Sequence, residues 1–189
     1  MYNSQTGQDR FLDIEVFKGF KGGVFIDVGA HDGVTINNTI FFENQRGWTG
    51  INVEPIKSVY DNLVINRPKC INVNCAISEI NGTADFIINS GYTEMLSGLK
   101  DTYDPRHLER LNNEIEHYGG NTITIPVTTI RLDAILHEYK FTHVNYLSID
   151  VEGAEFSVIK SIDFTKVFID VIGFENNFDD TSPEIVNYL

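Results

Sequence analysis

The sequence has 189 residues, of which 42% are hydrophobic and 12% aromatic, enough for one globular domain with a sizeable core. It contains 14 basic and 27 acidic residues, so nucleic acids and anionic membranes are disfavoured as partners. The first residues contain no apolar signal core, and the apolar runs are far shorter than the roughly 20 residues that span a bilayer. We expect a cytoplasmic protein with a single domain over residues 1–189.

Residues 1–20 are expected to form a helical leader. Phe11, Ile14 and Phe17 recur at helical spacing, and Gly19 can end the helix. Three polar residues precede or begin this pattern and are expected to cap the helix or face solvent, namely Gln5, Gln8 and Asp9.

The predicted fold is organised around the apolar run Val24–Val28, which ends in a loop with Gly29 and Gly33. After it, short apolar runs alternate with helical patterns, which predicts a parallel sheet with helices on both faces. The other strands of this sheet are expected at residues 50–53, 71–77, 144–149 and 167–174. Helices are expected at 34–47, from Ile56 to before Pro68, around 156–162 and from Ser182.

Two more strand-like segments, 84–88 and 123–130, flank a long insertion over residues 90–122. Within it, Asp104 and Pro105 can begin a helix. We expect the insertion to lie near the substrate site, because loops often carry binding residues. Its apolar stripe is expected to pack against the protein and consists of Leu108, Leu111, Ile115 and Tyr118.

The loop from Gly29 to Gly33 lacks the middle glycine of the dinucleotide fingerprint and the lysine of a nucleotide-binding P-loop. It is acidic instead, with Asp27 at the end of the strand and Asp32 inside the loop. These carboxylates favour S-adenosylmethionine, which is cationic at its reactive end, over a phosphate-bearing cofactor. Glu54 ends the second strand about 20 residues later, where a carboxylate can accept hydrogen bonds from ribose hydroxyls.

Six segments occur in the order and rough spacing of FkbM-type S-adenosylmethionine-dependent methyltransferases, namely FIDVGAHDG, GINVEP, NCAIS, IRLDAIL, YLSIDVEGAE and IGFEN. The start, SQTGQDRFL, also resembles the leader of many members. The resemblance implies an α/β fold, the Rossmann-like class I methyltransferase three-layer sandwich with a mostly parallel sheet. It also implies O-methylation, with sugars and natural-product hydroxyls as typical acceptors. The resemblance also implies a final antiparallel strand pair, which we do not expect within these 189 residues. Either the sequence is a fragment of a longer protein, or an oligomer contact or partner chain could complete that sheet edge.

The predicted cofactor site combines the glycine loop with the ends of the following strands. Its residues are Asp27, Gly29, Ala30, Gly33, Asn38, Glu54, Pro55, Ala76, Ile77 and Asp150.

Two mechanisms could activate an acceptor hydroxyl. A general base could take its proton, and the candidate catalytic residues are Asp150, Glu152 and His31. Alternatively, Mg²⁺ or Mn²⁺ could lower the pKa of the hydroxyl, held by oxygen ligands from Asp150, Glu175 and Asn176. The remaining histidines are expected at the surface or in capping positions, namely His107, His117, His137 and His143.

The leading functional hypothesis is an S-adenosylmethionine-dependent O-methyltransferase that acts on a sugar, a glycan or another polyhydroxylated small molecule. An NAD-dependent oxidoreductase would keep the fold but conflicts with the missing glycine. A non-catalytic cofactor-binding module of a larger assembly is the alternative outside enzymes.

Overall fold

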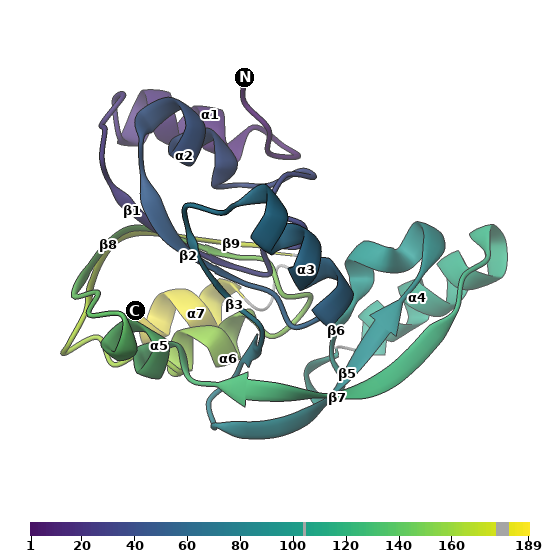
Figure 1. Cartoon of the computed structure of the whole chain (residues 1–189). Helices are drawn as coiled ribbons and strands as arrows, with labels where there is room; N and C mark the ends of the chain where they lie inside the picture. The colour runs from purple at the N-terminus through teal and green to yellow at the C-terminus, as the bar shows by residue number, and fades with distance from the viewer. Residues whose placement is uncertain (104, 177–181) are drawn as a thin grey trace.

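A computed structural model describes residues 1–103, 105–176 and 182–189, and it contains a parallel sheet with helices on both faces (Figure 1). The sheet has the strand order β3-β2-β1-β8-β9, and every pair in it is parallel. Its strands are β1 (Val24–Val28), β2 (Thr49–Val53), β3 (Ile71–Val73), β8 (His143–Ile149) and β9 (Phe168–Phe174). The predicted Rossmann-like α/β sandwich is therefore confirmed.

One face of the parallel sheet is covered by the leader and by the two helices that follow β1 and β2 (Figure 1). These elements are α1 (Gln8–Phe11), the π-helical turn η1 (Leu12–Val16), α2 (Ile40–Arg46) and α3 (Lys57–Asn66). Phe25 and Tyr146 project from the sheet into an aromatic core on this face, where they meet Phe42 and Trp48.

The opposite face carries α5 (Leu132–Glu138), α6 (Glu155–Lys160) and α7 (Ser182–Tyr188). The core on this side is aliphatic and includes Ile26, Val28, Leu147 and Ile149. Successive residues of a strand point to opposite faces, so β1 and β8 supply both cores and consist almost wholly of buried residues. No helix of the described residues is long and apolar enough to cross a membrane.

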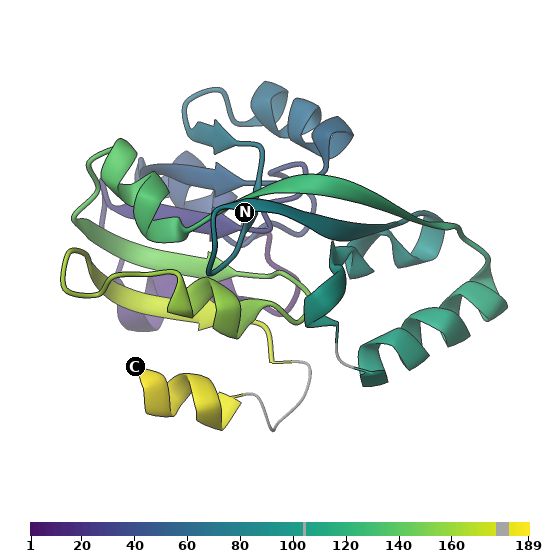
Figure 2. The same ribbon diagram turned by 90° about the horizontal axis from the view of Figure 1, so that it is seen from below.

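A second sheet with the strand order β4-β7-β5-β6 adjoins the first. It consists of β4 (Ala76–Ile77), β5 (Gly82–Asn89), β6 (Gly98–Leu99) and β7 (Thr122–Ile130). The antiparallel β5–β7 pair extends away from the parallel sheet and carries α4 (Pro105–Tyr118) at its far end (Figure 2). Between β5 and α4 lie two 3-10 helices, η2 (Gly91–Leu96) and η3 (Lys100–Thr102).

The prediction of one strand over 71–77 is wrong. Only Ile71–Val73 pairs with β2, whereas Ala76–Ile77 pairs with β7 in the second sheet. Hydrogen bonds to the end of β2 accompany the break, because the Asn74 amide donates to the carbonyl oxygens of Glu54 and Pro55 at 2.8 and 3.0 Å. These bonds hold the chain where it leaves one sheet for the other.

The helix predicted over 34–47 begins only at Ile40, because side chains hold the preceding residues in turns. The Asp32 carboxylate accepts hydrogen bonds from the backbone N–H groups of Val34 and Thr35, and Asn37 accepts those of Thr39 and Ile40. Such bonds compete with helix formation.

Two predicted apolar faces are only partly buried. In the leader, Phe11 and Ile14 are exposed, while Leu12 and Asp13 are buried. A π-helical turn begins at Leu12, which departs from the 3.6-residue period that the prediction assumed. In α4, Leu111 is buried but Tyr118 is exposed. The predicted cap at Asp104 lies outside the described residues.

The segment between β1 and α2 is held by the buried side chain of Arg67, which is 1% exposed. Its guanidinium donates to the carbonyl oxygen of Gly33 at 2.9 Å, to Asn37 at 3.1 Å and to Thr39 at 3.2 Å, and it pairs with Glu43. Asn37 and Thr39 in turn donate to the buried carboxylate of Asp27, each at 2.8 Å. One cation thus connects α3, α2 and the loop after β1.

We predict that Arg67→Leu lowers the free energy of unfolding by about 3–5 kcal/mol, because it leaves buried acceptors and the Glu43 carboxylate without their cation. Urea denaturation measures this loss. Lys57→Ala is the matched control, because its pair with Asp61 is exposed to solvent and is worth at most about 1 kcal/mol. Equal losses in the two variants would contradict the structural role of Arg67.

Candidate active site

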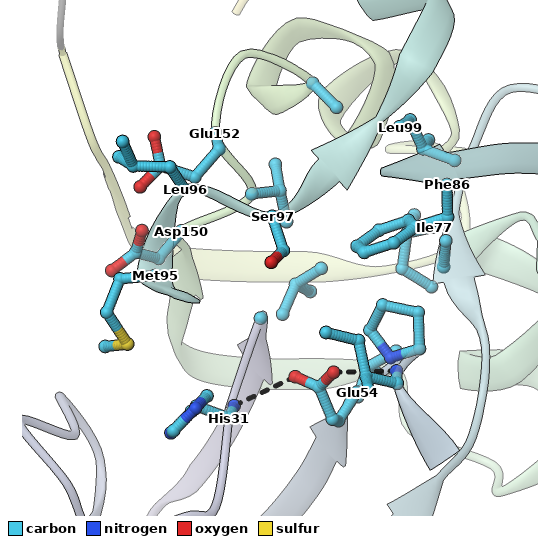
Figure 3. Close-up of a pocket in the computed structure, with 18 of the residues that line it drawn as sticks. His31, Glu54, Ile77, Phe86, Met95, Leu96, Ser97, Leu99, Asp150 and Glu152 are labelled. Carbon is cyan, nitrogen blue, oxygen red and sulfur yellow. Dashed lines mark hydrogen bonds between the residues drawn. The ribbon is translucent and has the colours of Figure 1, made fainter. Parts of the chain in front are cut away.

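A pocket lies at the carboxyl ends of β1, β2 and β8, where an open α/β sheet commonly binds ligands. On the side of the parallel sheet it is lined by Gly29, His31, Glu54, Pro55 and Asp150. The second sheet and the insertion close the other side with Phe86, Glu94, Met95, Leu96 and Leu99. Asp150 and Glu152 lie at one end of the pocket, and Ile77, Phe86 and Leu99 lie at the other (Figure 3). The pocket therefore has an acidic end and an apolar end.

Gly29 allows the loop after β1 to pass directly over the end of β8. Its φ is +84°, and a Cβ atom there would lie 1.8 Å from the carbonyl oxygen of Asp150. The Gly29 N–H donates to the carbonyl oxygen of Val53 at 3.0 Å, which also holds the loop against β2. Only glycine satisfies both the backbone conformation and the close approach.

The Glu54 carboxylate is 5% exposed and shapes the loop that it faces. One oxygen accepts the N–H of His31 at 3.1 Å, and the other accepts the N–H of Ile56 at 2.8 Å (Figure 3). Burial raises the pKa of Glu54 to about 7, and these two hydrogen bonds limit the rise.

Asp150, Glu152 and Glu175 form an acidic cluster in which one oxygen of each carboxylate lies within 4.8 Å of the others. Glu152 is buried, whereas Asp150 is exposed at the pocket wall. Desolvation by the surrounding protein, reinforced by the nearby Glu175 charge, raises the pKa of Asp150 to about 7 and that of Glu152 to about 9. The backbone of Glu152 has a φ of +55°, which is unusual for a residue with a side chain. A cation bound between these groups would relieve their repulsion.

His31 connects the loop after β1 to the insertion. Its Nε2 lies 3.5 Å from a carboxylate oxygen of Glu94 in η2, and its Nδ1 lies 3.6 Å from one of Asp32. The ring lines the pocket, where it could contact a ligand.

Most of the predicted site residues line this single pocket. They are Gly29, His31, Glu54, Pro55, Ala76, Ile77, Asp150, Glu152 and Glu175.

Five predicted site residues do not line the pocket, and they are Asp27, Ala30, Gly33, Asn38 and Asn176. Asp27 points to the opposite face of the sheet, and Asp32 binds the backbone of its own turn. The acidity of the pocket therefore comes from Glu54 and the acidic cluster, and not from Asp27 and Asp32 as predicted.

Gly33 packs against Leu63 and Arg67, and Ala30 is buried. Asn176, a predicted metal ligand, is exposed and does not line the pocket. In the one cluster of potential metal ligands among the described residues, Glu152 lies beside the two other predicted ligands, Asp150 and Glu175. The oxygen donors brought together thus differ from the predicted set by one residue.

Sequence reasoning missed the contribution of the insertion to this end of the site. His107 is predicted at the surface or in a capping position, but it is 2% exposed, and its Nε2 lies 3.5 Å from a Glu152 oxygen. Arg110 from the same helix lines the pocket beside the acids. An amphipathic helical pattern alone does not show which protein surface the helix will cover.

We predict that Gly29→Ala destabilises the protein by at least about 2 kcal/mol more than Gly47→Ala. Both positions have positive φ, and an alanine there costs roughly 1–2 kcal/mol through backbone strain. Nothing lies within 4 Å of a Cβ at Gly47, whereas the Gly29 position adds the clash with Asp150. Chemical denaturation of both variants tests this, and similar losses would contradict the close approach of the two loops.

We predict that Glu54 makes the protein less stable as the pH rises from about 4.5 to 7. A carboxyl whose pKa is raised on folding binds more protons in the folded state, so stability falls over this interval, here by roughly 3 kcal/mol. Glu54→Gln should flatten the pH dependence of the free energy of unfolding. The substitution also removes an acceptor of a backbone N–H, which lowers stability at every pH. The result that would contradict the prediction is therefore an unchanged slope of the free energy of unfolding against pH.

Residues 27–189 match the family model described as the methyltransferase FkbM domain. No curated protein and no solved structure matched the chain. The matched region includes the loop after β1, Glu54 and the acidic cluster, so every residue that lines the pocket except Gln5 lies within the family's domain. The chain therefore belongs to the FkbM methyltransferase family.

Proposed function

We propose that this protein is an S-adenosylmethionine-dependent O-methyltransferase that methylates a hydroxyl of a sugar, a glycan or a similar polyhydroxylated molecule. The observation that carries the proposal is the pocket with one acidic and one apolar end, bounded by Gly29 and Glu54 at the strand ends. We further propose that the protein works in the cytoplasm.

The residues present fit S-adenosylmethionine, which supplies a methyl group on a positively charged sulfonium. Ile77 and Phe86 at the apolar end would contact the adenine, and Glu54 would accept hydrogen bonds from the ribose hydroxyls. Asp150 and Glu152 at the acidic end would offset the positive charges of the amino acid portion and the sulfonium. The carboxylates repel one another, and a positively charged ligand would relieve this repulsion, which would favour its binding.

A carboxylate of the acidic cluster would act as the general base. S-adenosylmethionine would supply the methyl group, and the carboxylate of Asp150 or Glu152 would take the proton that the acceptor hydroxyl loses on methylation. A positively charged ligand would lower the pKa of both carboxyls and so ionise the base. Proton removal of this kind contributes about 10²–10⁴ in rate, and in-line positioning contributes more. His31 is the alternative base.

We predict that wild-type protein binds S-adenosylmethionine and S-adenosylhomocysteine in isothermal titration calorimetry, and that Glu54→Gln weakens binding of both by about tenfold or more. The reason is the loss of one charge-assisted acceptor for the ribose. Asp61→Asn, on the exposed side of α3, is the control and should bind as wild type does. Absence of S-adenosylhomocysteine binding at high micromolar concentration would contradict the proposed function.

Transfer of a radiolabelled methyl group to a panel of glycans then tests catalysis. We expect the substitutions Asp150→Asn and Glu152→Gln, taken together, to lower the rate of methyl transfer by a factor of about 10²–10⁴. Binding of S-adenosylhomocysteine without methylation of any glycan would instead support the non-catalytic module.

A metal ion is the second way to activate the hydroxyl, and Asp150, Glu152 and Glu175 supply the hard oxygen donors that Mg²⁺ or Mn²⁺ prefers. We predict that methyl transfer persists in EDTA, because the carboxylates can serve as bases without a metal. Loss of activity in EDTA, with recovery on added Mg²⁺ or Mn²⁺, would establish the metal mechanism instead.

A further inference from the structure

A second cavity, of about 570 Å³, lies on the other side of the acidic cluster. It is bounded by the leader, α1 and η1 on one side and by β8 and β9 on the other, on the face of the sheet that carries the aromatic core. Gln5, Asp150 and Glu175 line both this cavity and the first pocket. The two spaces therefore meet where the chemistry of methyl transfer is proposed to occur.

The leader is held over this junction by the side chain of Asp9, which is completely buried. Its carboxylate accepts the N–H of Asn3 at 2.5 Å, the N–H of Ser4 at 3.2 Å and the hydroxyl of Ser4 at 2.7 Å. The Asn3 amide donates to the carbonyl oxygen of Val34 at 2.6 Å, which ties the leader to the loop that follows β1. The residue that was expected to cap or to face solvent thus fixes the position of Gln5.

The lining of the second cavity combines amide and hydroxyl groups with aromatic rings. Gln5, Asn38 and Ser148 supply polar groups, and Phe11, Tyr146 and Phe174 supply aromatic ones. The Gln5 side chain is exposed, and no hydrogen bond joins its amide to any residue in the described ranges. A sugar presents hydroxyls around its ring and apolar C–H faces above and below it, so this combination suits a sugar.

We propose that the second cavity is the acceptor site and that it binds a sugar ring, with Gln5 as a hydrogen-bonding residue and Phe11 as an apolar contact. This inference rests on the proposed function and assigns the two reactants to opposite sides of Asp150 and Glu175. The cofactor would occupy the first pocket, beneath Glu94 and Met95 of the insertion. The acceptor would enter beside the leader, and its hydroxyl would meet the methyl group at the shared wall, as in-line transfer requires.

Saturation-transfer NMR on the protein loaded with S-adenosylhomocysteine tests this, with the methyl α-glycosides of glucose, galactose, mannose, rhamnose, fucose and xylose as probes. We expect at least one glycoside to bind wild-type protein, and Gln5→Ala and Phe11→Ala to weaken its binding by about fivefold or more. Both side chains are exposed, so neither variant should unfold the protein. The affinity for S-adenosylhomocysteine should stay within about twofold of wild type in Phe11→Ala, because Phe11 lines the second cavity and not the first pocket.

Gln45→Ala and Ile14→Ala are the matched controls, because each removes an exposed side chain of similar kind outside both cavities. They should bind the glycoside as wild type does. Unchanged glycoside binding in Gln5→Ala and Phe11→Ala would overturn the acceptor site while leaving the proposed function intact. Failure to bind S-adenosylhomocysteine would instead refute the proposed function.

Two further results would also overturn the inference. One is that no glycoside of the panel binds although S-adenosylhomocysteine does. The other is that a second copy of the chain covers the cavity, which light scattering would detect as a wild-type dimer that becomes a monomer in Phe11→Ala.

Discussion

The buried guanidinium of Arg67 is the interaction on which the geometry of the active site depends. The loop after β1 must leave the sheet, cross the end of β8 and return to begin α2, and it does so without regular hydrogen bonding over residues 29–39. Arg67 replaces those bonds by donating to Gly33, Asn37 and Thr39, and Asp27 accepts from the last two. A buried cation with so many acceptors defines one conformation of the loop, because any other arrangement would leave charged groups unpaired in the interior. The hydrogen-bond network around Arg67 thus lies outside the pocket lining, and it positions the loop that carries residues of the pocket.

At the acidic end of the pocket, unlike around Arg67, charges of the same sign lie close together. Three carboxylates converge there, and the pKa values of Asp150 and Glu152 are raised because desolvation and mutual repulsion disfavour their charged forms. Such an arrangement destabilises the protein without a ligand, and groups of this kind are typical of functional sites. For a methyltransferase the repulsion has a direct use. A cationic donor would be attracted to these acids, and by lowering their pKa values it would prepare one of them to accept a proton.

The two cavities give this site two separate approaches. The insertion, which follows β5 and precedes β7, supplies one wall of the first pocket, and the leader supplies one wall of the second. The leader and the insertion come from different parts of the chain, and the two cavities share Gln5, Asp150 and Glu175 in their linings. In the proposed arrangement, substitutions of leader residues that line only the second cavity, such as Phe11, would alter the acceptor site without touching the first pocket.

The sequence by itself determined the parallel sheet, the glycine loop and the carboxylates at the strand ends, because these depend on local patterns and on the common edge where parallel strands finish. Glu54 and Asp150 were found in this way. Only the tertiary structure decided that Asp27 faces away from the pocket, that Glu152 rather than Asn176 joins the acidic cluster, and that residues 71–77 divide between two sheets. It also placed His107 beside Glu152 and Gln5 between the cavities. Each of these outcomes depends on contacts between residues far apart in the chain, such as the bond from Asn74 to Glu54, and no local pattern of hydrophobicity or charge encodes such contacts.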